Sequence, residues 1–219
     1  MNHGIGRMSQ KNTYCKTRST LTFLIGIIMN SDSNENKKQQ TAVKIVIAYP
    51  FVIFLIAITL NVFVFNVNHF VISVPSMEYI RALVIASILL IINHTWLMTS
   101  TELTRARFKM FSTPEEWAAS GRTPDEAPVE GVIELKRHHD THLNNTENIV
   151  YYTLLCFAFI FVSPPVIAAE IFIIGYAASR LGYTYSFLSG KDGARGLFMT
   201  LSLLAMYGIA SYLLISLFI

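Results

Sequence analysis

The chain has 219 residues, of which 53% are hydrophobic and only 14% are charged. Soluble domains carry about 25% charged residues, so the composition excludes an ordinary soluble domain. The formal net charge of +3 is small and does not indicate a nucleic-acid partner. Cys15 lies in a polar, basic segment and Cys156 in an apolar one, which argues against a disulfide framework and against a zinc site built on cysteine.

Apolar stretches long enough to cross a bilayer, which takes about 20 helical residues, recur along the chain. The sequence predicts five such spans: 45–67, 79–100, 149–162, 166–188 and 197–219. The third is short, but a polar, helix-compatible stretch from about Val132 precedes it, so one helix of about 30 residues is expected there. The turn Ser163-Pro164-Pro165 predicts an antiparallel hairpin between the third and fourth spans. The fold class is therefore an all-α membrane protein.

The connecting segments differ in charge. Lys and Arg gather in residues 1–44, 101–148 and 189–196, and the positive-inside rule places these three segments in the cytosol. Residues 1–44 are expected to be a disordered extension. The apolar run Leu21–Met29 resembles a signal-peptide core, but we expect this segment to remain uncleaved. Ser112–Gly131 reads as a polar loop with three prolines.

The polar half of the third predicted helix holds the most informative side chains. On a helix, Arg137, Asn144, Glu147 and Tyr151 share one face. Glu147 then lies near the hydrocarbon boundary, where an unpaired carboxylate is costly. It is expected either to pair with Arg180 or another arginine, which would fasten the bundle, or to line a ligand pocket open to the cytosol.

Several arginines converge on the same membrane face. Arg180 is expected about two turns inside the fourth span, Arg105 near the end of the second, and Arg195 at the start of the fifth. Such a cluster suits a water-soluble ligand with carboxylates, because arginine binds carboxylate bidentately. His138, His139 and His142 are interpreted as a solvated helix end, and no metal site is predicted.

Four short motifs resemble one family. "HLNNTENI" (142–149) is similar to the "AHLNDLENI" pattern of microsomal glutathione transferases, which belong to the family of membrane-associated proteins in eicosanoid and glutathione metabolism (MAPEG). "STPEEWAASG" (112–121), "SRLGYTYSFL" (179–188) and "ARGLF" (194–198) resemble further segments in the same order. The resemblance covers residues 79–219 and fits the microsomal transferase and prostaglandin E synthase branches best.

The resemblance implies a four-helix protomer over 79–219, with 45–67 as one extra transmembrane helix, and a homotrimer that binds glutathione between protomers. Arg195 matches a fourth-helix arginine that stabilises the glutathione thiolate, and Arg180, which matches a third-helix arginine, is the second candidate for that role. Six further positions match residues that bind the tripeptide: Arg105, Arg137, His142, Asn144, Glu147 and Tyr183.

Some positions depart from the family pattern. Asp140 stands where an arginine is usual, and Asn145 replaces an aspartate. Phe187 stands where a tyrosine hydroxyl would approach the sulfur, and Gly196 follows Arg195 in place of a small or polar residue. The loss of the tyrosine weakens the case for catalysis more than the case for glutathione binding.

The function expected from this resemblance is a membrane-bound glutathione transferase, with glutathione peroxidase as a companion activity. Its partners would be glutathione, membrane lipid, and a lipophilic electrophile or lipid hydroperoxide. The alternatives are a glutathione-dependent prostaglandin E synthase-type isomerase, a non-catalytic lipid-binding member of the same fold, and an unrelated helical transporter or structural membrane protein. The expected location is the endoplasmic reticulum membrane, with the mitochondrial outer membrane as the alternative.

Overall fold

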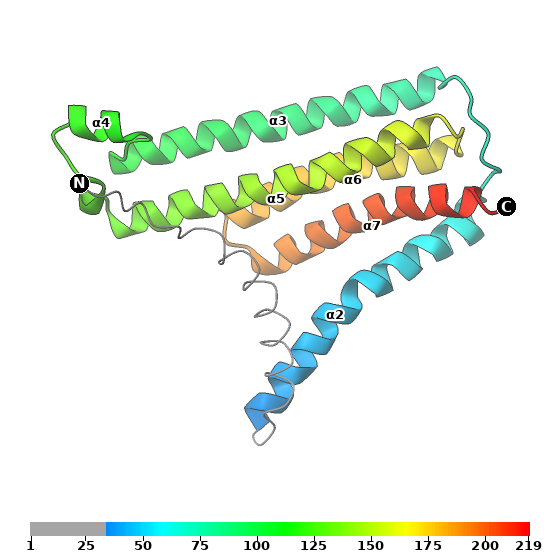
Figure 1. Cartoon of the computed structure of the whole chain (residues 1–219), viewed down its shortest axis with the longest axis horizontal. Coiled ribbons are helices and arrows are strands. Elements are labelled where there is room, and N and C mark those ends of the chain that lie inside the picture. The colour runs from blue at the N-terminus through cyan, green and yellow to red at the C-terminus, as the bar shows by residue number, and fades with distance from the viewer. Residues whose placement is uncertain (1–33) are drawn as a thin grey trace, which may run out of the picture. The chain divides into compact units, whose positions relative to one another are not determined.

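The computed structural model describes residues 34–219, and every regular element among them is helical (Figure 1). Five helices are long and two are short. They are α2 (Asn34–Leu60), which continues into the π-helical turn η1 (Asn61–Phe65), α3 (Met77–Phe108), α4 (Pro114–Ala119), the 3₁₀ turn η2 (Pro124–Glu126), α5 (Val129–Ile160), α6 (Val166–Leu188) and α7 (Asp192–Ser216).

Four of the described helices are long and apolar enough to cross a membrane: Lys37–Phe65, Met77–Phe108, Val166–Leu188 and Asp192–Ser216. The chain is a multi-pass membrane protein. The fifth long helix, α5, is polar over its first half, and its apolar part begins near Ile149. Its 32 residues match the single long helix expected there.

Several helix ends differ from the predicted ones because polar residues extend the helices past the apolar spans. α3 continues to Phe108 and ends where Lys109 adopts a left-handed φ of 53°. α7 begins at Asp192 rather than Leu197, with that acidic residue in its first turn, where the helix dipole favours negative charge. The predicted polar loop contains α4 and η2, each of which starts with a threonine–glutamate capping box.

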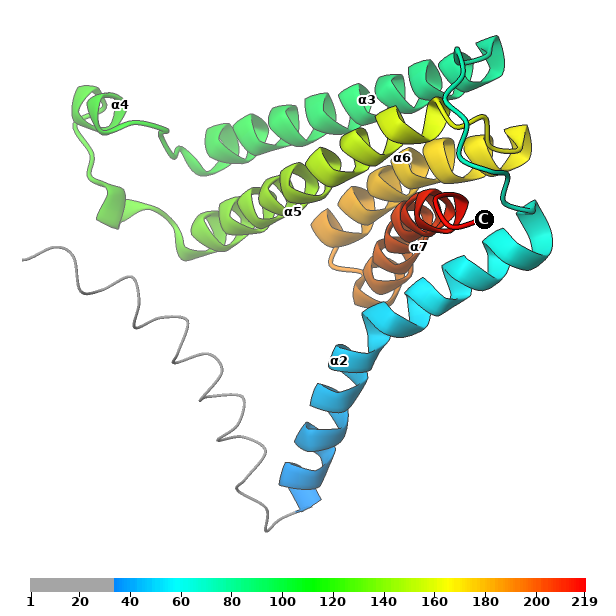
Figure 2. The same cartoon turned by 45° about the vertical axis from the view of Figure 1, so that its right-hand side comes forward.

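α3, α5, α6 and α7 form a four-helix bundle. α6 packs against α3 and α7, and α5 contacts all three of the others. α5 and α6 therefore lie between α3 and α7 (Figure 2). Small residues on α6, such as Ala168, Ala169 and Ala177, are completely buried and allow the close helix approach that membrane bundles need.

α2 is divided between two compact units, one ending at Val52 and the other spanning Ile53–Ile219. Of the first unit, residues 34–52 are described, and they are helical. Helix therefore starts eleven residues before the predicted span 45–67, in a stretch rich in the helix formers Glu, Lys and Gln. The rest of the predicted extension, including Leu21–Met29, lies outside the described residues.

The second unit includes the last turns of α2, which contact α7. Ile53, Ala57 and Asn61 recur every four residues and are buried. The Asn61 amide donates to the Gly208 carbonyl and to Ser211 Oγ, each at 2.8 Å. The non-helical segment that follows is tied down as well, since the Phe70 amide donates to the Ser216 carbonyl at 3.0 Å.

Candidate functional site

A buried arginine lies at the centre of the contact between α5 and α6. Arg180 is only 1% exposed. Its Nε and Nη2 donate to Asn145 Oδ1 at 2.7 and 2.5 Å, and Nη2 also donates to Asn144 Oδ1 at 2.7 Å. Asn145 in turn donates from Nδ2 to Thr184 Oγ1 at 3.1 Å. These acceptors are all neutral, and none of the ion pairs among residues 37–219 includes Arg180.

A row of rings and cations continues from Arg180 toward the start of α7. The Arg180 guanidinium lies over the Tyr183 ring, 4.4 Å from its centroid, and the Tyr183 and Phe187 rings are 5.7 Å apart. The Arg195 guanidinium lies 5.1 Å from the Phe187 centroid. Residues three and four apart on a helix share a face, so α6 aligns Arg180 with both rings. We call Arg180, Tyr183, Phe187 and Arg195 the cation–aromatic row.

A cavity of about 320 Å³ opens at the Arg195 end of this row. Its lining consists of Ile133, Lys136, Arg137, Asp140, Phe187, Gly190, Asp192 and Arg195. Two of these cations pair with acids inside the cavity, Lys136 with Asp140 at 2.9 Å and Arg195 with Asp192 at 3.2 Å. Arg137 donates from Nη1 to the Leu188 carbonyl at 3.4 Å. The cavity therefore presents both signs of charge, with cations in excess.

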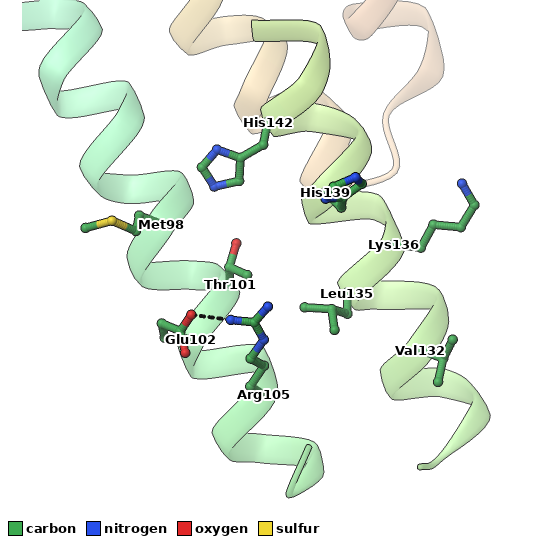
Figure 3. Close-up of a pocket in the computed structure, with 9 residues that line it drawn as sticks. All are labelled: Met98, Thr101, Glu102, Arg105, Val132, Leu135, Lys136, His139 and His142. Atoms are coloured by element: carbon green, nitrogen blue, oxygen red, sulfur yellow. Dashed lines mark hydrogen bonds and ion pairs between the residues drawn. The ribbon is translucent and has the colours of Figure 1, made fainter. Parts of the chain in front are cut away.

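A second cavity, of about 590 Å³, lies between α3 and α5 (Figure 3). It is lined by Met98, Thr101, Glu102, Arg105, Val132, Leu135, Lys136, His139 and His142. Arg105 donates from Nη1 to Glu102 at 2.5 Å, and its buried Nε has no hydrogen-bond partner among the described residues. The His142 ring meets the His94 ring edge-on at 5.9 Å. Burial, and then the charge of His94, lower the pKa of His142.

The structure places the sequence-predicted residues in two groups and leaves one, Glu147, outside both. Asn144, Arg180 and Tyr183 are in contact, and Arg195 and Arg137 lie further along toward the first cavity. The remaining predicted positions lie elsewhere. Arg105 and His142 line the second cavity on the α3 side, and Glu147 is exposed.

The expectation that Glu147 pairs with Arg180 or another arginine is wrong. Glu147 takes part in no ion pair among residues 37–219, and the guanidinium is bonded to Asn144 and Asn145 instead. The sequence singled out Thr184 with Arg180 on one helix, but it did not predict Asn145 as the side chain that contacts both of them. The detectable signal was a buried arginine opposite two consecutive amides, which together offer two acceptors from one helical turn.

His138, His139 and His142 lie close together on α5. Within the part of the chain that the structure describes, no group of three or more His, Cys, Asp or Glu residues is arranged to hold an ion. His138 is buried, and its Nδ1 lies 2.9 Å from the Glu134 carbonyl of its own helix.

The sequence was compared with the profiles of known protein families. The profile of the MAPEG family matches residues 83–215. The chain belongs to the MAPEG family. The match begins within α3, ends within α7 and leaves α2 outside. MAPEG proteins are generally glutathione-dependent membrane enzymes. A search of curated proteins gave no match.

Proposed function

We propose that this MAPEG protein is a glutathione transferase that joins the glutathione thiolate to lipophilic electrophiles and also reduces lipid hydroperoxides. The observation that supports this most is the cation–aromatic row, which leads from Arg180 to a charged cavity at one end of a membrane bundle. A water-soluble anionic thiol can enter such a cavity, while the apolar substrate partitions from the lipid. The proposed location is the endoplasmic reticulum membrane, with the mitochondrial outer membrane as the alternative.

The residues of the first cavity fit the chemistry of glutathione. Glutathione carries two carboxylates, an ammonium group and a thiol. Within this cavity Arg137 suits a carboxylate, and Asp140 suits the ammonium group. Asn144 does not line the cavity, and its proposed part in carboxylate binding rests on the family resemblance. Because Asn144 Oδ1 accepts from Arg180, this side chain offers a ligand its Nδ2 hydrogens, which are donors.

Arg195 is the proposed thiolate partner. Its side chain is 41% exposed and lies in the first turn of α7, where the helix dipole also favours an anion. A free thiol with a pKa of about 8.5 is mostly protonated at neutral pH, and a neighbouring cation raises the thiolate fraction. The Arg195–Asp192 pair is exposed, so a bound thiolate can compete for the guanidinium.

The reaction itself needs few protein groups. The thiolate sulfur donates an electron pair to the electrophilic carbon, the C–S bond forms, and the leaving group departs with its bonding pair. With a hydroperoxide, the sulfur attacks the terminal oxygen and the O–O bond breaks. The lipid leaves as an alcohol after it takes a proton, and a second glutathione converts the sulfenic form to glutathione disulfide with release of water.

Arg105 and His142 are proposed to contribute to the glutathione site of a neighbouring protomer. α3 and α7 lie on opposite sides of α5 and α6, so Arg105 and Arg195 belong to opposite flanks of the bundle. A homotrimer that binds glutathione between protomers would bring the α3 flank of one copy against the α7 flank of the next. Tyr183 and Glu147 would then complete the proposed binding set.

The test is glutathione binding and conjugation of a chloronitrobenzene electrophile by detergent-purified protein. Arg195→Ala is expected to abolish saturable turnover. The matched control is Arg81→Ala, which removes an exposed arginine at the opposite end of α3 and should leave turnover unchanged. Absence of glutathione binding in the wild-type protein, or full activity in Arg195→Ala, would overturn the proposal.

A non-catalytic role is the second candidate, and Phe187 is the observation that favours it. A phenyl ring stands in the row next to Arg195, where a tyrosine would place a hydroxyl donor near the sulfur. Binding of glutathione without turnover, together with turnover gained in Phe187→Tyr, would favour this candidate over the transferase.

A further inference from the structure

An aromatic pair lies on the outer surface of the bundle, on two neighbouring helices. Trp96 of α3 and Tyr185 of α6 are both exposed, and their ring centroids are 6.4 Å apart at an interplanar angle of 34°. Because α3 and α6 pack against each other, the two rings form one continuous surface. Neither ring lines either cavity of the candidate site. The pair therefore faces the surroundings of the bundle.

Both rings lie near the same end of their membrane helices. Trp96 is about one turn before the end of the predicted apolar span 79–100, and Tyr185 is about one turn before the end of α6. Tryptophan and tyrosine favour this depth, because the apolar ring meets hydrocarbon while its N–H or O–H meets the headgroups. The loop that follows α6 belongs to the segment 189–196, which the positive-inside rule assigns to the cytosol. The pair thus lies at the expected cytosolic boundary of the bilayer.

A lysine joins the pair from the loop between α6 and α7. Lys191 donates from Nζ to Tyr185 Oη at 2.9 Å, and the same nitrogen lies 4.7 Å from the centroid of the Tyr185 ring. The backbone of the loop is also fixed here. The Lys191 amide donates to the Ser186 carbonyl and the Arg195 amide donates to the Lys191 carbonyl, each at 2.9 Å. The ammonium group is therefore held beside the exposed phenol.

The charge of Lys191 is not neutralised within the described residues. Lys191 takes part in none of the ion pairs found there. The acid next to it in the sequence, Asp192, pairs instead with Arg195 at 3.2 Å. The surface around Tyr185 therefore carries a positive charge that an anion can neutralise.

Three groups of this surface remain able to donate to one ligand. The Lys191 ammonium has further N–H bonds besides the one to Tyr185. The Tyr185 oxygen accepts from the lysine, which leaves its O–H to donate elsewhere. The indole N–H of Trp96 forms no hydrogen bond among the described residues. Three donors and one positive charge at a membrane boundary suit a phosphate group.

We propose that Trp96, Tyr185 and Lys191 form a binding site for the phosphate headgroup of an anionic phospholipid of the cytosolic leaflet. The anionic lipids of that leaflet attract basic groups close to its surface. Ile88 and Ile92 precede Trp96 on the same face of α3 and are exposed, so they offer the acyl chains an apolar path away from the headgroup. The inference does not depend on the proposed transferase activity.

Trp96 itself can report on the lipid beside it. The chain has two tryptophans, Trp96 and Trp117, so Trp117→Phe leaves one fluorophore at the site. This full-length variant is reconstituted in vesicles with equal amounts of phosphatidylglycerol and phosphatidylcholine. In one sample the acyl chains of the first lipid carry bromine, which quenches indole fluorescence on contact, and in the other sample those of the second lipid do. Lipid composition and surface charge are identical in the two samples.

Random contact predicts equal quenching in the two samples. We expect stronger quenching when phosphatidylglycerol is brominated, corresponding to about fivefold enrichment of the anionic lipid beside Trp96, as one lysine near an anionic surface should produce. The wild-type protein, measured in parallel, should show a preference of the same sign, because Trp117 lies in the polar segment after α3. Equal quenching in the wild-type protein would overturn the proposal. Quenching by neither lipid would also overturn it, since the rings would then be covered by another protomer.

Lys191→Gln removes the charge and should make the two quenching values equal. The matched control is Lys109→Gln, which removes the same charge from an exposed lysine at the cytosolic end of α3 and should leave the preference intact. A preference that survives Lys191→Gln would overturn the proposal. An equal loss in both variants would do so too, because the preference would then come from the general surface potential.

Tyr185→Phe tests whether the three side chains act together. It keeps the aromatic ring but removes the oxygen that holds Lys191 and the O–H that faces the ligand. We expect the enrichment of phosphatidylglycerol to fall to between the values of the parent protein and Lys191→Gln. An undiminished enrichment would overturn the built site and leave a lone surface lysine as its cause.

Discussion

The environment of His142 makes its protonation costly. The residue lies on the polar half of α5, against α3, where burial and the neighbouring His94 lower its pKa. The cavity that it lines also contains Arg105, Lys136 and the single carboxylate of Glu102. A further proton on this side chain would therefore enter a region that already has an excess of cations.

This lowered pKa predicts a loss of stability in mild acid. An unfolded histidine titrates near about 6.5, so below that pH the unfolded chain binds more protons than the folded one. The contribution of His142 is therefore fully present above the unfolded pKa and is lost as the pH falls below it. We expect the melting temperature in detergent to drop between pH 7.5 and 5.5, and to drop less in His142→Gln.

His69→Gln is the control for this titration, because His69 is exposed in the segment between η1 and α3. Its melting curve should follow that of the wild type at every pH. An acid-induced loss of the same size in His142→Gln and wild type would show that other groups cause it.

At this scale the sequence grouped side chains better than it paired them. Arg180, Asn144 and Tyr183 were chosen from helical spacing and motif, and Arg180 contacts the other two; their role in binding stays a prediction. Spacing along one helix says which residues share a face but not which residue of the next helix they meet. Spacing therefore left Arg180 as one possible partner of Glu147, although Asn145 of the same helix contacts this arginine.

At the scale of elements, close packing of α6 against α7 depends on glycine. A Cβ at Gly208 would lie 2.3 Å from the Phe172 ring, and one at Gly182 would lie 2.4 Å from the Phe198 ring. Each glycine thus admits an aromatic ring from the partner helix. Such contacts replace the hydrophobic driving force that is missing between helices in lipid.

Gly208→Ala should therefore destabilise the bundle. The ring of Phe172 is packed inside the core and must move to admit a methyl group, and overpacking of this kind costs about 1–3 kcal/mol. Thermal unfolding in detergent measures the effect. Gly175→Ala, in the middle of α6 with no atom within 4 Å of the added Cβ, is the matched control and should not lower the melting temperature. A loss of equal size in both variants would refute the packing argument.

A second element-scale prediction concerns the attachment of η1, the turn that follows α2, to α7. Asn61→Ala removes the two hydrogen bonds to Gly208 and Ser211. Interhelical hydrogen bonds in membranes contribute about 0.6 to 1.7 kcal/mol, so we expect a modest loss of stability. Faster proteolysis in the segment 66–76 should accompany it, since that segment follows the released helix end.

Thr59→Ala provides the comparison for Asn61→Ala. Thr59 lies on the same helix, is exposed, and donates only to the Leu55 carbonyl of its own helix. Its removal should change neither the melting temperature nor the cleavage pattern. If both variants behave alike, the anchoring role of Asn61 is wrong.

Helices were predicted more accurately than their ends. Long apolar stretches identify spans because a bilayer demands about 20 such residues, and Val166–Leu188 matches α6. The polar extensions of α3 and α7 lie beyond the apolar spans, so the thickness of the bilayer does not fix their length. Their ends depend on caps and on backbone conformation, as at Lys109, and apolar length carries no information about either.

At the scale of the whole molecule, Arg105 and Arg195 lie on opposite flanks of the bundle. Both are proposed to bind the same glutathione. Each arginine pairs with an acid of its own helix, Glu102 or Asp192, and the helices that carry them lie across the bundle from each other. If both bind the same glutathione, the binding site lies between protomers. In a ring of copies, each site then takes one flank from each of two neighbours.

This arrangement predicts complementation between two inactive variants. Arg105→Ala and Arg195→Ala homo-oligomers should both conjugate poorly, because each lacks one flank at every site. Co-expression in equal amounts should restore activity, since about a quarter of the interfaces would then pair two intact flanks in a randomly mixed ring. The measurement is conjugation by hetero-oligomers purified through two different affinity tags, one on each variant. Mixing the variants after separate purification, without subunit exchange, is the control and should restore nothing. If both arginines act within one protomer, every protomer of the mixed oligomer still lacks one of them. Activity would then stay at the level of the single variants. The outcome therefore decides between a site within the protomer and a site shared between two protomers.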